Sequence, residues 1–269
     1  EMLIAARVVR HSGASSEGED MSRFFVETSD IQGNNIYITD KNDIHHIKKV
    51  LRLKPGSEVD ISDKMDWEYR AEIEKIQDEQ VVLLILDKQK FAREPETKIT
   101  LYQGIPKGGK MEEIIQKSVE LGVYSIVPVF MDRTVVVDKG NFAKKMNRWQ
   151  KISDEAVKQC RRGIIPQVEE PVDFKQAVDR LANYDIVIFP YENEENRTIK
   201  DCLKNYMQTE KGHSAEAAVI IGPEGGFSQK EAEMLAEQNI LSVSLGKTIL
   251  RTETAGPATI AMIMYELEL

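Results

Sequence analysis

Residues 219–231 read VIIGPEGGFSQKE, and this stretch decides the fold class of the larger part of the chain. A continuous apolar run stops at Gly222 and Pro223, two more glycines follow, and Ser228 then stands three residues before Glu231. A serine and a glutamate at this spacing before a helical pattern form a capping box, because each side chain accepts a hydrogen bond from an exposed backbone N–H. The stretch therefore predicts a buried strand, a glycine-rich loop and a helix beginning at Ser228.

The same alternation of strand and helix extends from Ile99 to the end of the sequence. Apolar runs typical of buried strands lie at 98–104, 124–130, 184–190, 217–222 and 241–246. Helical patterns cover 110–121, 141–161, 173–182, 198–207, 228–238 and 254–267. Continuous apolar strands alternating with helices indicate a parallel sheet covered on both faces. The sequence thus predicts an α/β domain over residues 97–269, with ligands bound at the carboxyl ends of the strands.

The first part of the chain has a different pattern. Short strand-like runs separated by turn residues extend from 22 to 87, and one helical stretch from Asp40 to Leu51 interrupts them. This pattern predicts a small β-barrel over residues 21–90. The polar segment 87–98, which contains a proline, is the candidate linker. We interpret residues 1–20 as a tag or upstream extension and Met21 as the natural start.

Composition narrows the class of protein. The chain has 269 residues, 41% of them hydrophobic and 30% charged, as in ordinary soluble globular proteins. The two cysteines form no disulfide framework, which fits a reducing cytoplasm, and the four histidines show no metal-ligand spacing, so no metal is expected. No apolar run reaches the roughly 20 residues that span a bilayer. The net charge of −9 by itself argues against a nucleic-acid partner. Basic residues gather at 41–54 and 144–162, however, so RNA is still a candidate partner.

The sequence of the glycine-rich loop limits the kinds of ligand that it could bind. It contains neither a P-loop nor a dinucleotide fingerprint, and the helix after it is capped by its own side chains. A loop with few side chains lets its backbone approach a ligand closely, although a plain tight turn would look the same. The second loop, SLGKTILRTETAGP at 244–257, also follows a strand, and it carries Arg251 and Glu253 before a helix with Pro257 in its expected first turn. Two such loops after successive strands favour a ligand site.

These loops also carry a resemblance. IGPEGGFS at 221–228 followed by LGKTILRTETA at 245–255 closely resembles the paired motifs of the SPOUT, or trefoil-knot, RNA methyltransferases, and among them the RsmE-type enzymes that methylate uridine N3 in small-subunit ribosomal RNA. Further matches, in order along residues 21–269, are HIKKVLR at 46–52, Lys107 with KME at 110–112, QKSVELGV at 116–123, and Glu155-Ala156, Gln159, Arg161 and Pro166. Thr248 departs from the family, which commonly has arginine there.

The resemblance implies a PUA-like, RNA-binding β-barrel for 21–90 and a knotted parallel-sheet methyltransferase domain for 97–269. It implies S-adenosyl-L-methionine as the methyl donor and an antiparallel homodimer with sites near the interface. Small-subunit ribosomal RNA, or the assembled small ribosomal subunit, is the implied partner, in the cytoplasm and without a membrane.

Candidate site residues follow from the chemistry of methyl transfer to uridine N3. That nitrogen must lose a proton, and a cation near O2 and O4 would stabilise the anion; Arg251 is the first choice. Glu253 is either the base that takes the proton or an ion-pair partner of Arg251, and we favour the pairing. The third possible wall of the pocket includes Tyr191 and Glu192. The expected cofactor-binding residues are Tyr191, Gly222, Pro223, Glu224, Gly225, Gly226, Leu245, Gly246, Ile249, Leu250, Thr254 and Ala255, although Glu224 could instead fix the loop's shape.

Candidate RNA contacts come from the basic segments, because Lys and Arg supply the phosphate contacts that dominate affinity. They are Arg23, His46, Lys48, Arg52, Lys107, Lys110, Arg161 and Arg162. For any single lysine, a solvated surface charge is the alternative, and for His46 a packed or capping side chain. Two other functions remain open: a nucleotide-binding α/β protein, which the missing phosphate fingerprints disfavour, and a non-catalytic RNA-binding assembly factor.

Overall fold

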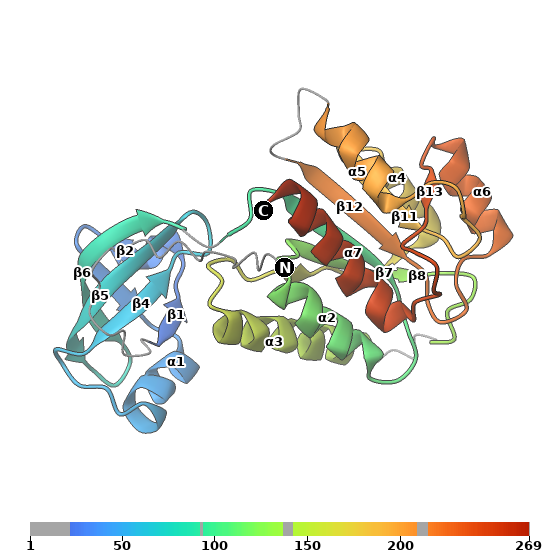
Figure 1. The fold of residues 1–269 in the computed structure, drawn as a ribbon. Coiled ribbons are helices and arrows are strands. Elements are labelled where there is room, and N and C mark those ends of the chain that lie inside the picture. The colour runs from blue at the N-terminus through green and yellow to red at the C-terminus, as the bar shows by residue number, and fades with distance from the viewer. Residues whose placement is uncertain (1–21, 92–93, 137–141, 209–214, 269) are drawn as a thin grey trace, which may run out of the picture. The chain divides into compact units, whose positions relative to one another are not determined.

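The computed structural model describes residues 22–91, 94–136, 142–208 and 215–268. The chain divides into two compact units, which are drawn in Figure 1 and are described separately below. The first comprises the residues up to Ser62 together with Glu68–Lys88, and the second comprises Asp63–Trp67 together with the residues from Gln89 onward. The expected extension 1–20 and the start at Met21 lie outside the described residues.

The first unit is built on a six-stranded sheet in the order β1-β4-β5-β6-β3-β2. Its strands are β1 (Arg23–Phe25), β2 (Ile31–Gln32), β3 (Asn35–Ile38), β4 (Glu58–Ser62), β5 (Trp67–Ile76) and β6 (Val81–Lys90), with a short 3₁₀ helix η1 (Thr28–Asp30) before β2. β1 runs parallel to β4, whereas β4 with β5, β3 with β6 and β2 with β3 are antiparallel. Alternate residues such as Val59, Ile61 and Ile73 are fully buried, which is the period of a half-buried strand. The predicted strands of this unit are confirmed.

The helical stretch of this unit has two parts. Helix α1 (Lys41–His45) starts at Asp40, whose carboxylate accepts hydrogen bonds from the backbone N–H groups of two following residues. The chain then continues as a wider π-helical turn, η2 (His46–Val50). Buried Ile44 and Ile47 hold this stretch against the sheet. The expected helix is thus present, but its second half is wound differently.

The second unit has an all-parallel sheet in the order β10-β8-β7-β12-β11-β13, with β9 pairing beside β8. The strands are β7 (Lys98–Gly104), β8 (Ser125–Phe130), β9 (Gln167–Val168), β10 (Val172–Asp173), β11 (Ile186–Pro190), β12 (Glu216–Ile221) and β13 (Ser242–Val243). Leu101, Val127 and Val219 in its centre are completely buried. The predicted parallel sheet is confirmed, and the two-residue strands β9 and β10 are additions.

Six helices of the described chain cover this sheet: α2 (Lys110–Glu120), α3 (Phe142–Cys160), α4 (Phe174–Leu181), α5 (Ile199–Met207), α6 (Gln229–Glu237) and α7 (Thr252–Leu267). α7 packs against α2, α5 and strands β7 and β12, and it crosses the front of the sheet in Figure 1. α4 and α6 enclose a separate apolar cluster that includes Phe174, Phe227 and Leu235. None of the helices that the structure describes is long and apolar enough to cross a bilayer.

One expectation about a segment end is wrong. Helix α7 starts at Thr252, because Arg251 is its extended N-cap residue, so Pro257 is the sixth helical residue and does not lie in the first turn. The candidate linker 87–98 contains the boundary between the two units, which falls after Lys88, although β6 extends to Lys90 and the Glu94 carboxylate accepts hydrogen bonds from Arg162 and from the backbone N–H groups of Gly163 and Ile164.

Candidate active site

A cavity of about 1070 Å³ lies at the carboxyl ends of β11, β12 and β13 in the second unit. Three loops form its walls: residues 190–198 after β11, residues 221–227 after β12, and residues 244–251 between β13 and α7. Side chains from the start of α7 and Lys110 of α2 complete it. This is the position at which open parallel sheets bind ligands, and the expected crevice is confirmed.

Most of the expected site residues line this cavity. Arg251 and Glu253 do so, and so do Tyr191, Gly222, Pro223, Glu224, Gly225, Gly226, Leu245, Gly246, Ile249, Leu250 and Ala255. Thr254 does not; it is exposed on α7. Lining residues outside the two motifs include Pro190, Glu194, Glu195 and Thr198, for which the sequence carries no recognisable signal. Phe227 also lines the cavity and lies within the first motif, but it is not among the expected site residues.

The glycines of the 221–227 loop are required by its close folding. Gly226 has φ 67°, and a Cβ there would lie 2.7 Å from a carboxylate oxygen of Glu192. A Cβ on Gly222 would lie 3.0 Å from the backbone of Gly226. The Gly226 N–H donates to the Pro223 carbonyl at 2.9 Å and closes the turn, while the Phe227 ring packs edge-on against Phe189. The loop therefore brings bare backbone to the cavity wall.

A loop that the sequence does not mark, residues 131–134 after β8, fastens this wall from outside. The Arg133 guanidinium donates to the Gly225 carbonyl at 2.5 Å. The Ser228 hydroxyl donates to the Asp132 carboxylate at 2.7 Å, and the Asp132 N–H donates to Glu231 at 2.8 Å. Glu231 also completes the predicted capping box with Ser228, which is confirmed.

A buried chain of two hydrogen bonds connects the two motifs below the cavity. The Gln103 side-chain amide at the end of β7 donates to the Thr252 hydroxyl at 2.9 Å, and that hydroxyl donates to the Gly222 carbonyl at 2.7 Å. Gln103 is completely buried and Thr252 is nearly so. Because these groups are shielded from water, the link fixes the start of α7 against the loop after β12.

The Arg251 side chain projects from the start of α7 into solvent. Its side chain is 82% exposed, and a guanidinium nitrogen lies 4.0 Å from a Glu253 carboxylate oxygen. Ile249, two residues earlier, is 83% exposed. The expected pairing of Arg251 with Glu253 is therefore present as a loose contact, and the guanidinium remains accessible to a substrate.

Lys110 connects the carboxylates of both motifs. Its ammonium lies 3.2 Å from Glu224 Oε1 and 3.2 Å from Glu253 Oε2. The contact with Glu253 raises the pKa of Lys110. A hydrogen bond from its own backbone N–H, aided by Lys110, lowers the pKa of Glu253. Burial raises the pKa of Glu224, but its own N–H, Lys110 and the Lys107 N–H outweigh burial and lower it. A carboxylate with a lowered pKa is a poor base, so pairing is the better role for Glu253.

The loop after β11 adds further negative charge to the cavity. A hydrogen bond from the Ser242 hydroxyl, followed by those from the N–H groups of Asn196 and Arg197, lowers the pKa of Glu194 to about 2. Glu192 and Glu195 line the same wall. Nowhere in the described chain do three or more His, Cys, Asp or Glu side chains form a group that could hold a metal ion.

Two of the expected RNA contacts are wrong because the side chains are buried in internal pairs. The Arg162 guanidinium donates to Glu94 and to the carbonyls of Val119 and Val123, and Arg162 is only 5% exposed. The Arg23 side chain is 10% exposed and lies 2.8 Å from Glu68. Both arginines are structural. Lys107 and Arg161 are exposed on the second unit, whereas Lys110 belongs to the cavity described above.

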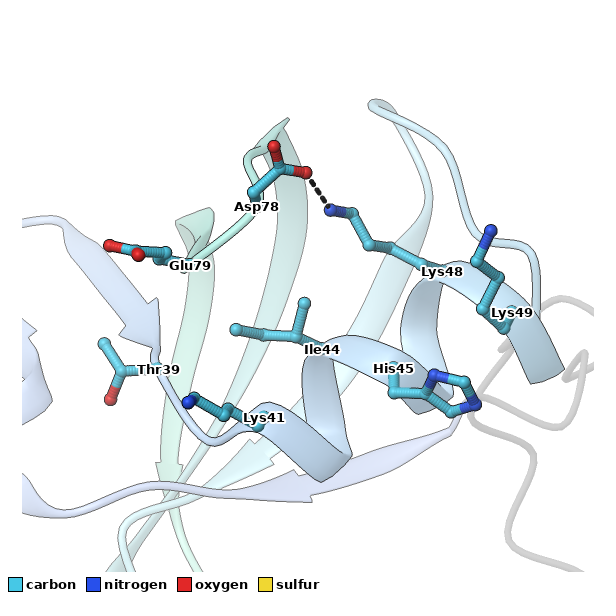
Figure 2. Close-up of a pocket in the computed structure, with 8 residues that line it drawn as sticks. All are labelled: Thr39, Lys41, Ile44, His45, Lys48, Lys49, Asp78 and Glu79. Atoms are coloured by element: carbon cyan, nitrogen blue, oxygen red, sulfur yellow. Dashed lines mark hydrogen bonds and ion pairs between the residues drawn. The ribbon is translucent and has the colours of Figure 1, made fainter.

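The remaining candidates lie in the first unit. A separate pocket of about 540 Å³ lies there. Figure 2 shows its lining residues, which are Thr39, Lys41, Ile44, His45, Lys48, Lys49, Asp78 and Glu79. Lys48 reaches across it to Asp78 at 3.0 Å. His46 is not among the lining residues; its ring meets Phe24 edge-on. Arg52 is exposed with φ 53°. Lys41, His45 and Lys49 line this pocket but are not among the candidate RNA contacts, although all three lie in the basic segment 41–54.

Comparisons with known proteins agree with this geometry. Residues 93–264 match the family model of the RNA methyltransferase domain, and residues 38–86 match the RNA methyltransferase PUA domain. Ribosomal RNA small subunit methyltransferase E of Bacillus subtilis is 32% identical over 93% of this chain and 98% of its own length. This chain belongs to that family. A relative of the same name from Mesomycoplasma hyopneumoniae is 30% identical over 87% of this chain and 95% of its own.

Solved structures extend the agreement to the fold. The small subunit methyltransferase E of Neisseria gonorrhoeae, bound to S-adenosyl methionine, has a TM-score of 0.77 at 28% identity and covers 91% of this chain and 97% of its own. A putative methyltransferase from Legionella pneumophila, in complex with the same cofactor, has a TM-score of 0.77 at 32% identity, over 92% and 98%. The predicted fold class, a knotted SPOUT methyltransferase domain preceded by a PUA-like barrel, is confirmed for this family member.

Proposed function

We propose that this RNA methyltransferase transfers the methyl group of S-adenosyl-L-methionine to N3 of one uridine in small-subunit ribosomal RNA. The observation that carries the proposal is the single cavity into which both glycine loops and the accessible Arg251 converge. Membership in the small subunit methyltransferase E family supports the substrate, and relatives of known structure were crystallised with the cofactor.

The cavity fits the proposed cofactor in shape and charge. The bare backbone of Gly222, Gly225 and Gly226 would permit close approach of adenine and ribose, and a Cβ at any of the three would crowd its neighbours in the fold. Backbone groups at Leu245–Gly246 and Ile249–Leu250 would hold the rest of the molecule, with the apolar side chains against the ring. The carboxylates of Glu192, Glu194 and Glu195 complement a cofactor that carries a sulfonium and an ammonium group. Tyr191 supplies an aromatic wall.

The bound cofactor would supply an electrophilic methyl group, and the chain's residues would prepare the acceptor. Arg251 would lie against the uracil oxygens and stabilise the anion left when N3 loses its proton to solvent water. That interaction lowers the pKa of N3 and makes the proton easier to lose. Glu253 would keep the guanidinium on its side of the cavity, and the loops would align the nucleophile with the methyl group.

RNA contacts would come from both units. Residues 21–90 would serve as the RNA-binding domain through the basic pocket of Figure 2 and Arg52, and residues 97–269 would contribute Lys107 and Arg161. We also propose a homodimer, because Ile249 and Tyr265 expose apolar surface beside the cavity and on α7. Action on ribosomal RNA or the small subunit would place the protein in the cytoplasm.

Mass-spectrometric mapping of ribosomal RNA from cells that lack the gene tests this function. We expect one N3-methyluridine of the small subunit to disappear and to return with the wild-type gene but not with Arg251→Ala. An unchanged modification profile would exclude the proposal, and restoration by Arg251→Ala would favour a non-catalytic assembly factor.

A further inference from the structure

We infer that Lys110 is a positioning residue for methyl transfer: its ammonium holds the two cofactor loops together and thereby sets the direction of Arg251. This assignment rests on the proposed function and replaces the expected RNA contact of Lys110.

The geometry places one cation between two loops that are distant in sequence. Lys110 is the first residue of α2, and its ammonium lies 3.2 Å from Glu224 in the loop after β12 and 3.2 Å from Glu253 in the first turn of α7. The three side chains are 29%, 25% and 14% exposed, in that order. The Lys107 backbone N–H also donates to Glu224, at 3.2 Å, so two residues at the entry to α2 hold the same carboxylate.

The charges explain why a lysine stands at this point. A lysine in the first turn of a helix opposes the helix dipole, which is unfavourable by itself. Two facing carboxylates offset that cost and need the cation, because without it two negative charges would share a partly buried space. Glu253 Oε2 is buried and accepts no hydrogen bond of good geometry among the described residues, so its contact with Lys110 is an ion pair.

The link to Arg251 runs through the start of α7. Arg251 is the N-cap residue of that helix, two residues before Glu253, and its largely exposed side chain has little packing to orient it. The Gln103–Thr252–Gly222 link fixes the helix start from beneath. The Lys110 bridge fixes Glu253 from the cavity side, and Glu253 in turn is the carboxylate closest to the guanidinium. Losing the bridge would leave the fold in place but loosen the loops.

The same contacts argue against RNA as the partner of Lys110. A phosphate would have to displace two carboxylates from its ammonium. Lys107 lies three residues earlier with an exposed side chain and contacts Glu224 through its backbone alone. The neighbouring lysines therefore divide the work, with Lys107 directed to RNA and Lys110 to the cofactor loops.

The test compares Lys110→Gln with Lys107→Gln in the purified full-length protein. Isothermal titration without RNA gives the dissociation constant for S-adenosylmethionine, and steady-state methylation of small subunits gives kcat and both KM values. We expect Lys110→Gln to weaken cofactor binding about tenfold and to lower kcat, with an unchanged KM for RNA. Lys107→Gln should do the reverse, raising the KM for RNA and leaving cofactor binding as in the wild type.

A triple variant, Lys110→Gln with Glu224→Gln and Glu253→Gln, separates positioning from folding. It removes the repulsion left by the single change, so cofactor affinity should partly recover, and thermal melting checks that each variant folds. Wild-type cofactor binding by Lys110→Gln, together with a raised KM for RNA, would overturn the inference. A wild-type protein that neither binds S-adenosylmethionine nor methylates RNA would instead refute the proposed function, together with the inference that rests on it.

Discussion

The two loops that meet at the cavity are built in opposite ways. The loop after β12 is held from outside by Arg133 and from beneath by Thr252, and it ends in a capped helix and a buried phenylalanine. The loop before α7 leaves Ile249 and Arg251 more than four-fifths exposed. The rigid loop would hold part of the methyl donor, whereas the exposed loop leaves Arg251 accessible to a large RNA. We therefore expect turnover to depend most strongly on the exposed Arg251, and cofactor affinity to depend on the closely folded backbone of the loop after β12 together with the backbone of 245–250.

Removing the exposed guanidinium should have the largest effect. We expect Arg251→Ala to lower kcat by about 10²–10³-fold, because it deletes the group that stabilises the uridine anion, while the melting temperature stays unchanged. Transfer of labelled methyl groups to small subunits measures kcat. Lys230→Ala, an exposed cation on α6, is the matched control and should be fully active. Equal losses in both variants would contradict a specific role of Arg251 in turnover.

The second-largest effect should be on cofactor affinity, when a side chain is added to the loop after β12. Gly226→Ala places a Cβ 2.7 Å from Glu192 at φ 67°, so we expect a loss of about 1–3 kcal/mol of stability and at least about tenfold weaker S-adenosylmethionine binding. Gly33→Ala has a similar φ of 62° but open space around it, and it should cost stability without changing cofactor affinity. Calorimetric titration of both variants decides whether crowding at the cavity matters.

Breaking the buried Gln103–Thr252–Gly222 link should chiefly lower the free energy of unfolding. Thr252→Val keeps the shape of the side chain but leaves the Gly222 carbonyl and the Gln103 amide without their hydroxyl partner. The free energy of unfolding should fall by about 1–3 kcal/mol. Thr254→Val, exposed on the same helix, should change it by less than about 0.5 kcal/mol. Urea unfolding compares the two; a similar result for both would show that the link contributes nothing.

The smallest effect concerns acid stability of the loop after β11. The pKa of Glu194 is lowered to about 2 from 4.5, so its contribution to stability is complete above pH 4.5 and is lost as the pH falls toward 2. Ser242→Ala removes the leading cause of that shift, and the stability difference between pH 6 and pH 3 should shrink. Ser244→Ala, whose hydroxyl bonds Gly246 instead, is the control and should retain the wild-type difference. Melting curves across this range provide the measurement.

Features that depend on neighbouring residues could be predicted from the sequence. The parallel strands, the glycine loops and the Ser228 capping box all arise from local patterns, and their meeting at one cavity follows from the geometry of parallel sheets. Local patterns carry no information on which charges pair across the fold. In the sequence, Arg162 has the pattern of a surface cation. In the structure it pairs with Glu94, which lies 68 residues away along the chain. Lys110 and Arg133 reach loops about a hundred residues distant, so no spacing rule could assign them.

Methylation in vitro tests the central claim most directly. The experiment combines the purified chain with small ribosomal subunits from cells without the gene and with S-adenosylmethionine that carries an isotopically labelled methyl group. The RNA is then digested to nucleosides for mass spectrometry. We expect the label in N3-methyluridine at about one per subunit, and none with Arg251→Ala on the same time scale. Label in a different nucleoside, or none with the wild-type protein, would contradict it.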